Sequence, residues 1–162
     1  MSVRVYVPTT FAGLRAVVQS DGVGPSPFVA HAVTDPVRAE LADGGEEEWE
    51  YAASTAAAQG SVELLLEGDV PRRVVIAVDV ASVRRVGSDD PTLVEVDEVA
   101  PMRRVAAVLA DDAAAEGDVA AAREALAAGA PDRDRLLERC LEHDLAWWAN
   151  QEIVDLLDQT SA

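Results

Sequence analysis

The pentapeptide Val74-Val75-Ile76-Ala77-Val78 is a continuous apolar run with no alternation of polar residues. A run of this kind is typical of a strand in the middle of a sheet, where both faces are covered. We therefore expect residues 74–78 to form a central, buried strand. The rest of the chain should then supply neighbouring strands and the helices that cover the two faces.

The N-terminal segment predicts the first neighbour of this strand. Residues 3–8 alternate between apolar and polar side chains, which indicates a half-buried strand that ends at Pro8. A helix capped by Thr9 or Thr10 should follow. After a loop rich in glycine and proline, residues 28–33 predict a second strand. The three elements form a β-α-β unit, whose crossover would be right-handed if the two strands are parallel neighbours.

The second half of the chain predicts two more strands. Residues 93–99 form a poorer strand, whose charged side chains suit the edge of a sheet. Residues 105–109 predict a further strand, although their alanines leave a helix as an alternative. Helical patterns fill residues 35–68 and 111–159.

The chain is expected to end in one amphipathic helix of roughly 25 residues that begins after Pro131. The predicted fold class is therefore mixed α/β (α+β), with one sheet of about four to five strands packed by helices. No linker or repeat divides the chain, so residues 1–162 are expected to form a single globular domain.

The charge of the chain limits its partners. Its 162 residues carry 30 Asp and Glu against 13 basic residues, all arginine, for a formal charge of −17. Direct binding to nucleic acid is not expected, because it requires a basic surface. An acidic surface could instead imitate nucleic acid, but acidity also simply keeps proteins in solution, so this hypothesis is the least favoured. Adjacent arginines are expected to pair with the surplus carboxylates, at Arg72-Arg73, Arg84-Arg85 and Arg103-Arg104.

Cysteine and histidine are scarce. Cys140 is the only cysteine, so the chain cannot form an internal disulfide. One cysteine and two histidines cannot supply the ligands of a structural zinc site, and no metal or other cofactor is predicted. The sequence contains neither an apolar run that could cross a membrane nor a signal peptide. Together these features predict a cytoplasmic protein with no membrane partner.

Polar residues in or beside the predicted strands are the candidates for a catalytic site. His31 lies within a strand, where its imidazole could act as a base, although a partly buried histidine with ordinary hydrogen bonds is the default interpretation. Asp79 follows the buried strand and could bind a cation or accept a proton; it could equally cap the next turn or pair with Arg84. Tyr6 is the third candidate. An enzyme or ligand-binding domain requires at least two of these three groups to converge in one pocket.

The turn at Thr9 and Thr10 is a weak candidate for anion binding, because it follows a strand and opens a helix. Ordinary capping of the helix is the favoured interpretation, since no glycine-rich phosphate loop is present. No serine or cysteine lies in a recognisable nucleophile motif either. The sequence therefore does not favour covalent hydrolysis.

The predicted C-terminal helix has two apolar stripes, which is more than one core contact needs. Trp147 lies on the second stripe with Asp144 and Gln151, where it could anchor a protein partner or a second copy of the chain. Packing of the tryptophans in the core is the alternative. His143 is expected to face solvent. Asp144 and Glu152 lie about two helical turns apart, so they could not bind one metal ion without ligands from elsewhere.

Several stretches carry a resemblance to a known family: Val5-Tyr6-Val7-Pro8-Thr9-Thr10, Ala30-His31-Ala32-Val33-Thr34, Glu48-Trp49-Glu50-Tyr51-Ala52, Arg73-Val74-Val75-Ile76-Ala77-Val78-Asp79-Val80, and the residues from His143 to Ile153. Over nearly the whole chain they are similar to an uncharacterised family of small acidic actinobacterial proteins. That family has no assigned activity, cofactor or catalytic residue. The resemblance implies a lineage and a cytoplasmic setting only.

The first functional hypothesis is a non-catalytic interaction or regulatory module, because no motif assembles a nucleophile, a base and a residue that orients them. The alternative is a small enzyme or ligand-binding domain, with or without a metal, whose site lies near His31 and Asp79. A pocket that joins these groups would favour the alternative.

Overall fold

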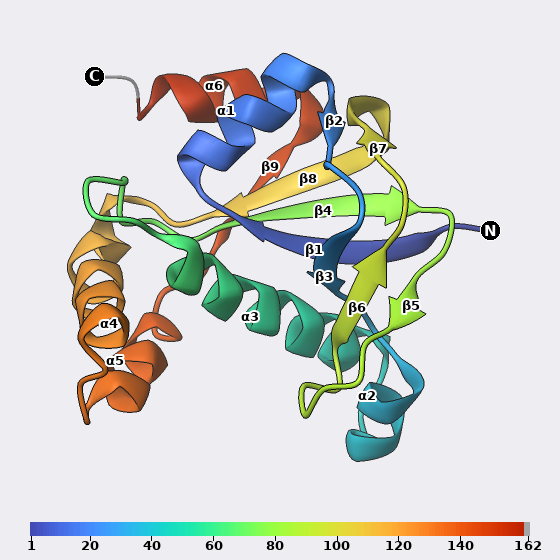
Figure 1. Ribbon diagram of the computed structural model, residues 1–162, viewed down its shortest axis with the longest axis horizontal. Coiled ribbons are helices and arrows are strands. Elements are labelled where there is room, and N and C mark those ends of the chain that lie inside the picture. Colours follow the sequence, from blue (N-terminus) through green and yellow to red (C-terminus); the bar gives the residue numbers. More distant parts are fainter. Residues whose placement is uncertain (161–162) are drawn as a thin grey trace.

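The computed structural model describes residues 1–160, which form a large and a small antiparallel sheet with helices packed against them (Figure 1). The large sheet has seven strands in the order β5-β6-β3-β1-β4-β8-β9. Their bounds are β1 (Val3–Thr9), β3 (Phe28–His31), β4 (Val74–Val80), β5 (Arg84–Arg85), β6 (Leu93–Val96), β8 (Val105–Ala110) and β9 (Ala146–Ala149). The small sheet pairs β2 (Gly22–Val23) with β7 (Ala100–Pro101).

The helices are α1 (Phe11–Ser20), α2 (Asp35–Glu40), α3 (Glu46–Leu64), α4 (Glu116–Ala128), α5 (Arg133–Cys140) and α6 (Ile153–Asp158). Short 3-10 turns lie at Met102–Arg104, Ala113–Ala115 and Asn150–Glu152. The predicted fold class, mixed α+β, is confirmed.

The apolar run Val74–Val78 forms the buried part of β4, as expected. Each of its residues is at most 1% exposed, and β4 pairs with β1 on one side and β8 on the other. Strand β8 also settles the ambiguity of residues 105–109, because it pairs with β4 through most of its length. Strand β4 is central because it pairs on both sides, whereas a strand at the edge of the sheet leaves a row of N–H and C=O groups unpaired.

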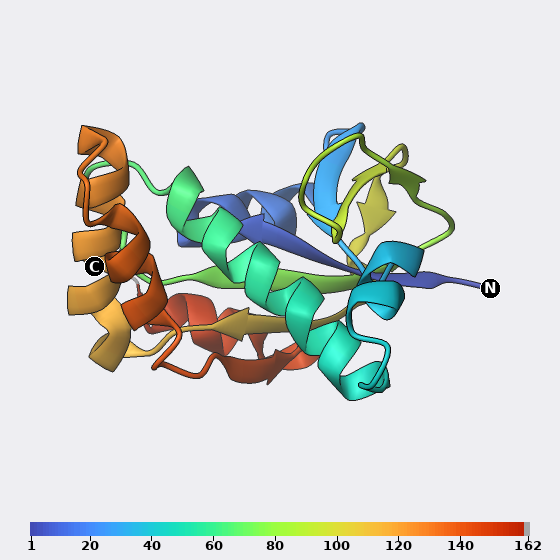
Figure 2. The ribbon, with the colours of Figure 1, turned by 90° about the horizontal axis from the view of Figure 1, so that it is seen from below.

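Different helices cover the two faces of the large sheet. One face packs against α1, α6 and the small sheet, through side chains such as Leu14 and Ile153. The other packs against α3, which crosses the sheet obliquely (Figure 2). Ala53 and Ala57 of α3 are fully buried, and side chains this small let the helix lie close to the strands. The C-terminal part of α3 also forms an apolar cluster with α4 and α5.

The first β-α-β segment differs from a parallel unit, because β3 pairs with β1 in the antiparallel direction. Helix α1 ends at Asp21, whose φ of 58° is left-handed. The chain then forms β2 against β7 before it enters β3. This detour reverses the direction of the chain, so a right-handed parallel crossover is not formed.

The predicted sheet of four to five strands is too small, because β5 and β9 were not expected. Strand β5 covers β6, so residues 93–96 do not form the sheet edge. The negative charge of Glu95 in β6 is instead balanced by Arg84 in β5, with which Glu95 forms an ion pair.

The long C-terminal helix was the main error of the sequence analysis. Helix α5 ends at Cys140, and residues 146–149 form strand β9 against β8. Two distant contacts hold this path: the His143 carbonyl accepts a hydrogen bond from Arg73 Nη2, and Asn150 Nδ2 donates to the Met102 and Val105 carbonyls. Tertiary contacts of this kind outweigh the local helical pattern.

Candidate functional site

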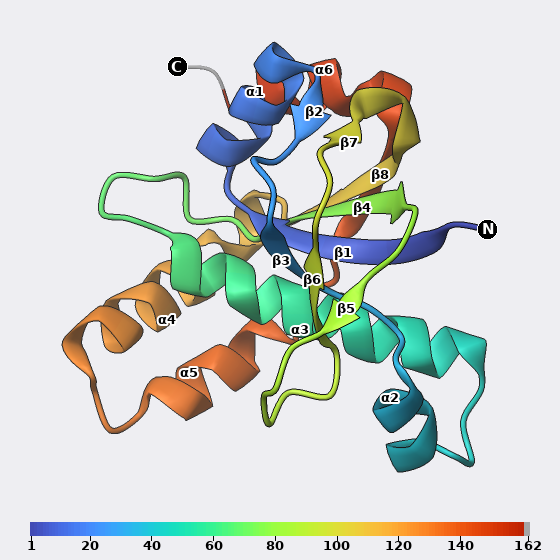
Figure 3. The same ribbon diagram turned by 45° about the vertical axis from the view of Figure 1, so that its right-hand side comes forward.

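A crevice lies where strands β1 and β3 separate. Their only register pair is Tyr6 opposite His31. Continuing this register would place Thr9 opposite Phe28, but the described strands do not pair there. Pro8 lies in the part of β1 that pairs with β4 but not with β3, and it has no amide proton to donate to a neighbouring strand. In Figure 3, β3 and β6 turn away from the direction of β1 and β4.

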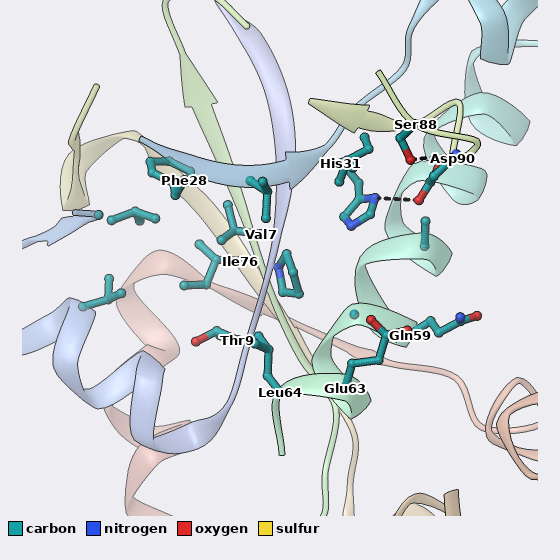
Figure 4. A pocket seen from close by; sticks show the side chains of 18 residues that line it. Val7, Thr9, Phe28, His31, Gln59, Glu63, Leu64, Ile76, Ser88 and Asp90 are labelled. Carbon is teal, nitrogen blue, oxygen red and sulfur yellow. Dashed lines mark hydrogen bonds and ion pairs between the residues drawn. The ribbon is translucent and has the colours of Figure 1, made fainter. Parts of the chain in front are cut away.

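The space left by this separation is a cavity of about 610 Å³. Val7 and Ile76 line it from the side of the sheet that packs on α1, whereas Gly60 and Glu63 line it from α3. The cavity therefore reaches both faces of the sheet at the gap between β1 and β3. Figure 4 shows His31 on one side of this space, with Glu63 and Leu64 of α3 across from it.

His31 is held by a short hydrogen-bonded chain. Its Nδ1 lies 2.8 Å from Thr92 Oγ1, and Thr92 Oγ1 donates to Asp90 Oδ1 at 2.7 Å. Asp90 Oδ1 also accepts from the Thr92 backbone amide, which fixes the turn that carries both residues. His31 is 6% exposed and Thr92 4% exposed, so most of this chain is sheltered from solvent.

These bonds determine the tautomer of His31. The Thr92 hydroxyl donates its single proton in the hydrogen bond to Asp90, so Thr92 Oγ1 accepts a hydrogen bond from His31 Nδ1–H. In the neutral imidazole, Nε2 is then the free acceptor. No hydrogen bond reaches Nε2 within residues 1–160. A β-carbon built on Gly60 would lie 3.8 Å from Nε2, which places this nitrogen next to the lining of the cavity.

Burial lowers the pKa of His31 below its ordinary value of 6.5. The negative charges of Asp90 and Glu63 oppose this effect but do not overcome it. The imidazole is therefore neutral at neutral pH. It can accept a proton or a hydrogen bond at Nε2 from a molecule in the cavity.

Tyr6 and Asp79 belong to a different network, which is centred on Arg4. Arg4 Nε donates to Asp79 Oδ1 at 2.8 Å, and this hydrogen bond is the main reason that the pKa of Arg4 is raised. The Tyr6 hydroxyl donates to Glu50 Oε2 at 2.7 Å. Burial, followed by this bond, raises the pKa of Tyr6. Neither Tyr6 nor Asp79 lines the cavity beside His31.

The three predicted catalytic residues are thus not brought together. The expectation for Asp79 came from parallel sheets, in which ligands bind beyond the carboxyl ends of the strands. In this antiparallel sheet, Asp79 near the end of β4 lies opposite Arg4 near the start of β1. It pairs with Arg4 rather than with Arg84, and forms a cross-strand ion pair instead of a strand-end site.

The turn at Thr9 and Thr10 caps α1. Thr10 Oγ1 accepts a hydrogen bond from the Gly13 amide at 3.1 Å, so this side chain has the capping role that the sequence favoured. Thr9 lines the cavity, and its carbonyl accepts a bond from Ser61 on α3. Anion binding at this turn stays a prediction.

The residues predicted as an interface no longer share a helical stripe. Trp147 lies on the edge strand β9 and is 57% exposed. Asp144 precedes this strand and lines a separate hollow with Tyr51, whereas Gln151 follows the strand in a 3-10 turn. The stripe disappears because residues 144–151 do not form an α-helix.

Other ionisable groups form closed pairs away from the cavity. His143 Nε2 lies 2.8 Å from Asp118 Oδ2, so this histidine has an acidic partner that the sequence did not reveal. Burial raises the pKa of the Cys140 thiol, as expected for an inert buried cysteine. Each predicted arginine doublet contributes at least one ion pair: Arg72–Glu116, Arg73–Asp111, Arg84–Glu95 and Arg104–Glu98.

The sequence analysis missed three residues of the site: Asp90, Thr92 and Glu63. The sequence Asp90-Pro91-Thr92 did contain a signal, because an aspartate often accepts a hydrogen bond from the backbone two residues later. Glu63 gave no signal, since a glutamate on a helix is ordinarily solvated.

Within residues 1–160, no three His, Cys, Asp or Glu side chains are grouped so that they could hold a metal ion. No helix of that range is long and apolar enough to cross a membrane.

A model described as a family of unknown function (DUF6912) matches residues 3–157. The chain belongs to this family. No curated protein and no solved structure matches the chain. Because the function of DUF6912 is unknown, membership in it assigns no activity to this site. The match does not address the actinobacterial lineage, which stays a prediction.

Proposed function

We propose that this member of DUF6912 is a small-molecule-binding protein, whose ligand occupies the crevice between β1, β3 and α3 and contacts His31 Nε2. One observation carries the proposal. His31 is only 6% exposed, yet its Nε2 has no hydrogen-bond partner within residues 1–160 and lies beside a cavity of about 610 Å³. Small-molecule sites commonly have volumes of about 300–1,000 Å³ and few polar groups.

The surroundings of His31 support a binding role rather than a purely structural one. No fully buried side-chain nitrogen or oxygen of the described residues lacks a partner, so Nε2 keeps some accessible surface, and this surface faces the cavity. Here Thr92 and Asp90 orient the ring through one nitrogen. The other nitrogen is left for a ligand, which would donate a hydrogen bond to it.

The same arrangement supports a catalytic form of this proposal. His31 Nε2 could take a proton from the bound molecule, and the hydrogen bond from Nδ1 to Thr92 would keep the ring in the required orientation. Asp90, through Thr92, would then be a positioning residue. Turnover of an identified ligand, lost in His31→Gln, would establish this form; binding without turnover would establish the simpler one.

A neutral probe tests the binding role without assuming the natural ligand. We expect 2-phenylethanol, titrated into the full chain, to shift the backbone amide NMR signals of Val7, His31 and Gly60. His31→Gln should weaken binding by about tenfold, the equivalent of one hydrogen bond. His143→Gln is the matched control, because His143 pairs with Asp118 outside the cavity. Shifts confined to other regions, or equal weakening by both variants, would contradict the proposal.

Association through β9 is a second candidate function, favoured by Trp147. This side chain is 57% exposed on a strand at the edge of the sheet, where a second copy of the chain could add its own edge strand. Trp147→Ala should then abolish concentration-dependent dimerisation in sedimentation experiments, with a stability change within about 0.5 kcal/mol. A wild-type chain that stays monomeric at high concentration would rule this out.

A cytoplasmic setting is also part of the proposal. Its support is the single cysteine, which is buried and has no disulfide partner. Fractionation of cells that produce the protein at its natural level would test this setting, and recovery outside the cytoplasm would contradict it.

A further inference from the structure

The crevice is divided into an apolar and a polar part. Val7, Phe28 and Ile76 lie together in its apolar part (Figure 4). The polar part contains His31, Glu63 and Asp90, with Gln59 and Ser88 beside them. A ligand that matches both parts needs an apolar body and a polar group at one end.

The charges of the lining have a single sign. Glu63 and Asp90 are the charged residues that line the cavity, and no arginine belongs to the lining that the described residues form. The net charge of −17 adds to the same potential. An anionic ligand would be repelled from this site, whereas a cation would be attracted.

Neither acid is paired with an arginine in the described part of the chain, and both reach solvent, since Glu63 is exposed and Asp90 is partly exposed. Glu63 makes no hydrogen bond or ion pair within the described part of the chain. Asp90 uses Oδ1 to hold Thr92, and its Oδ2 lies 3.5 Å from His31 Nδ1. Because burial keeps His31 neutral by lowering its pKa, the imidazole does not supply the missing positive charge.

An independent observation points to a hydrogen-bond donor on the ligand. His31 is 6% exposed, and its Nε2 is an acceptor with no partner within residues 1–160. A protonated amine satisfies both requirements, since it carries positive charge and N–H donors on the same atom. An alcohol would satisfy only His31, and a carboxylate would satisfy neither requirement.

We infer that the ligand of the crevice is an amphipathic amine, whose ammonium group faces Glu63 and donates a hydrogen bond to His31 Nε2, while its apolar body packs toward Phe28. Asp90, on the Nδ1 side of the ring, adds negative charge at longer range. This inference rests on the proposed binding function and assigns its ligand class.

Three probes with the same phenyl body test the ligand class: 2-phenylethylamine, 2-phenylethanol and 3-phenylpropanoate. Each is titrated into the full chain at pH 7.5 and low salt, and amide NMR shifts locate the site and give the Kd. The amine should bind about tenfold more tightly than the alcohol, as expected for one charge-assisted contact, and the carboxylate should bind most weakly.

Glu63→Gln keeps the shape of the side chain and removes its charge. It should reduce the preference for the amine over the alcohol several-fold, while binding of the alcohol is unchanged. Glu124→Gln is the matched control, since Glu124 is an exposed helical glutamate of α4 that does not line the crevice. Both variants change the net charge equally.

The outcomes separate the two proposals. If the alcohol binds in the crevice but the amine binds no more tightly, the amine class is overturned and the binding function stands. If Glu63→Gln and Glu124→Gln change the preference equally, the preference comes from net charge and the assignment to the crevice is overturned. If none of the three probes shifts the crevice signals, both proposals fail.

Discussion

Two buried polar centres of this protein differ in how completely the chain satisfies them. The closed centre consists of Arg73 and Asp111, which are 3% and 2% exposed. Arg73 bonds both carboxylate oxygens of Asp111 at 2.8 Å, and its Nη2 also donates to the His143 carbonyl. The open centre is His31, where one nitrogen is bonded and the other lies beside the cavity.

The difference separates stability from binding. Arg73 precedes β4, Asp111 follows β8, and His143 precedes β9, so the closed centre joins three strands of the sheet. The open centre lies where two strands stop pairing, and its bonds leave one acceptor for another molecule. We therefore expect changes at the closed centre to affect folding, and changes at the open centre to affect mainly binding.

The largest effect should come from Asp111→Asn. It removes the charge that compensates a buried arginine, and breaking such a pair costs about 3–5 kcal/mol of unfolding free energy. Urea unfolding would measure the loss. Asp132→Asn is the control, because Asp132 pairs with Arg135 at the surface and should cost less than about 1 kcal/mol. Equal losses in the two variants would mean that the closed centre does not stabilise the fold.

His31→Gln should cost less stability than Asp111→Asn. It removes a hydrogen bond to Thr92 whose net contribution is about 1 kcal/mol, and Thr92 retains its bond to Asp90. Binding of a probe in the crevice should nevertheless weaken, for the reasons given above. A loss of stability as large as that of Asp111→Asn would show that His31 is a structural residue.

Acid should destabilise the open centre. The pKa of His31 is lower in the folded protein than its ordinary value of 6.5, mainly because of burial, so the unfolded chain binds a proton more readily. The stability that His31 contributes is therefore complete above about pH 6.5, and is lost as the pH falls from there through the lower, folded pKa.

This pH effect can be assigned by comparing variants. Asp90 and Glu63 are the charged groups that act on His31, and both oppose its lowered pKa. Unfolding experiments between pH 7.5 and 5 should show a smaller loss of stability for His31→Gln than for the wild type. Using His143→Gln as the background removes the other histidine. If His143→Gln and the double variant His31→Gln/His143→Gln lose the same stability over this pH range, burial does not lower the His31 pKa.

Sequence patterns predicted the central strand of the sheet better than the C-terminal segment. The run Val74–Val78 identified the central strand because two-sided burial leaves a purely local signature. The segment 141–153 was misread, because its apolar residues fit a helix and its strand depends on bonds from Arg73 and Asn150 to distant carbonyls. A local pattern does not contain such contacts.

The candidate site was predicted only through His31. An imidazole within a strand is an unusual residue, and this is what singled it out. Its partners come from other elements: Asp90 and Thr92 precede β6, and Glu63 belongs to α3. Tyr6 lies opposite His31 in the register, yet its hydroxyl bonds Glu50 and does not line the cavity. Adjacency in a sheet therefore did not determine which side chains share a site.

The smallest predicted effect concerns how closely α3 approaches the open centre. Gly60 and Gly117 are both helical glycines, and replacing a helical glycine with alanine usually stabilises a protein by about 0.5–1 kcal/mol. A β-carbon at Gly117 would contact nothing within 4 Å, whereas one at Gly60 would lie 3.2 Å from Pro8. Gly117→Ala should therefore stabilise by about 0.5 kcal/mol, and Gly60→Ala should stabilise less or destabilise. Chemical unfolding of both variants measures the difference. Equal stabilisation would show that β1 can move away from α3 at Pro8 without cost. The crevice beside His31 would then be deformable rather than preformed.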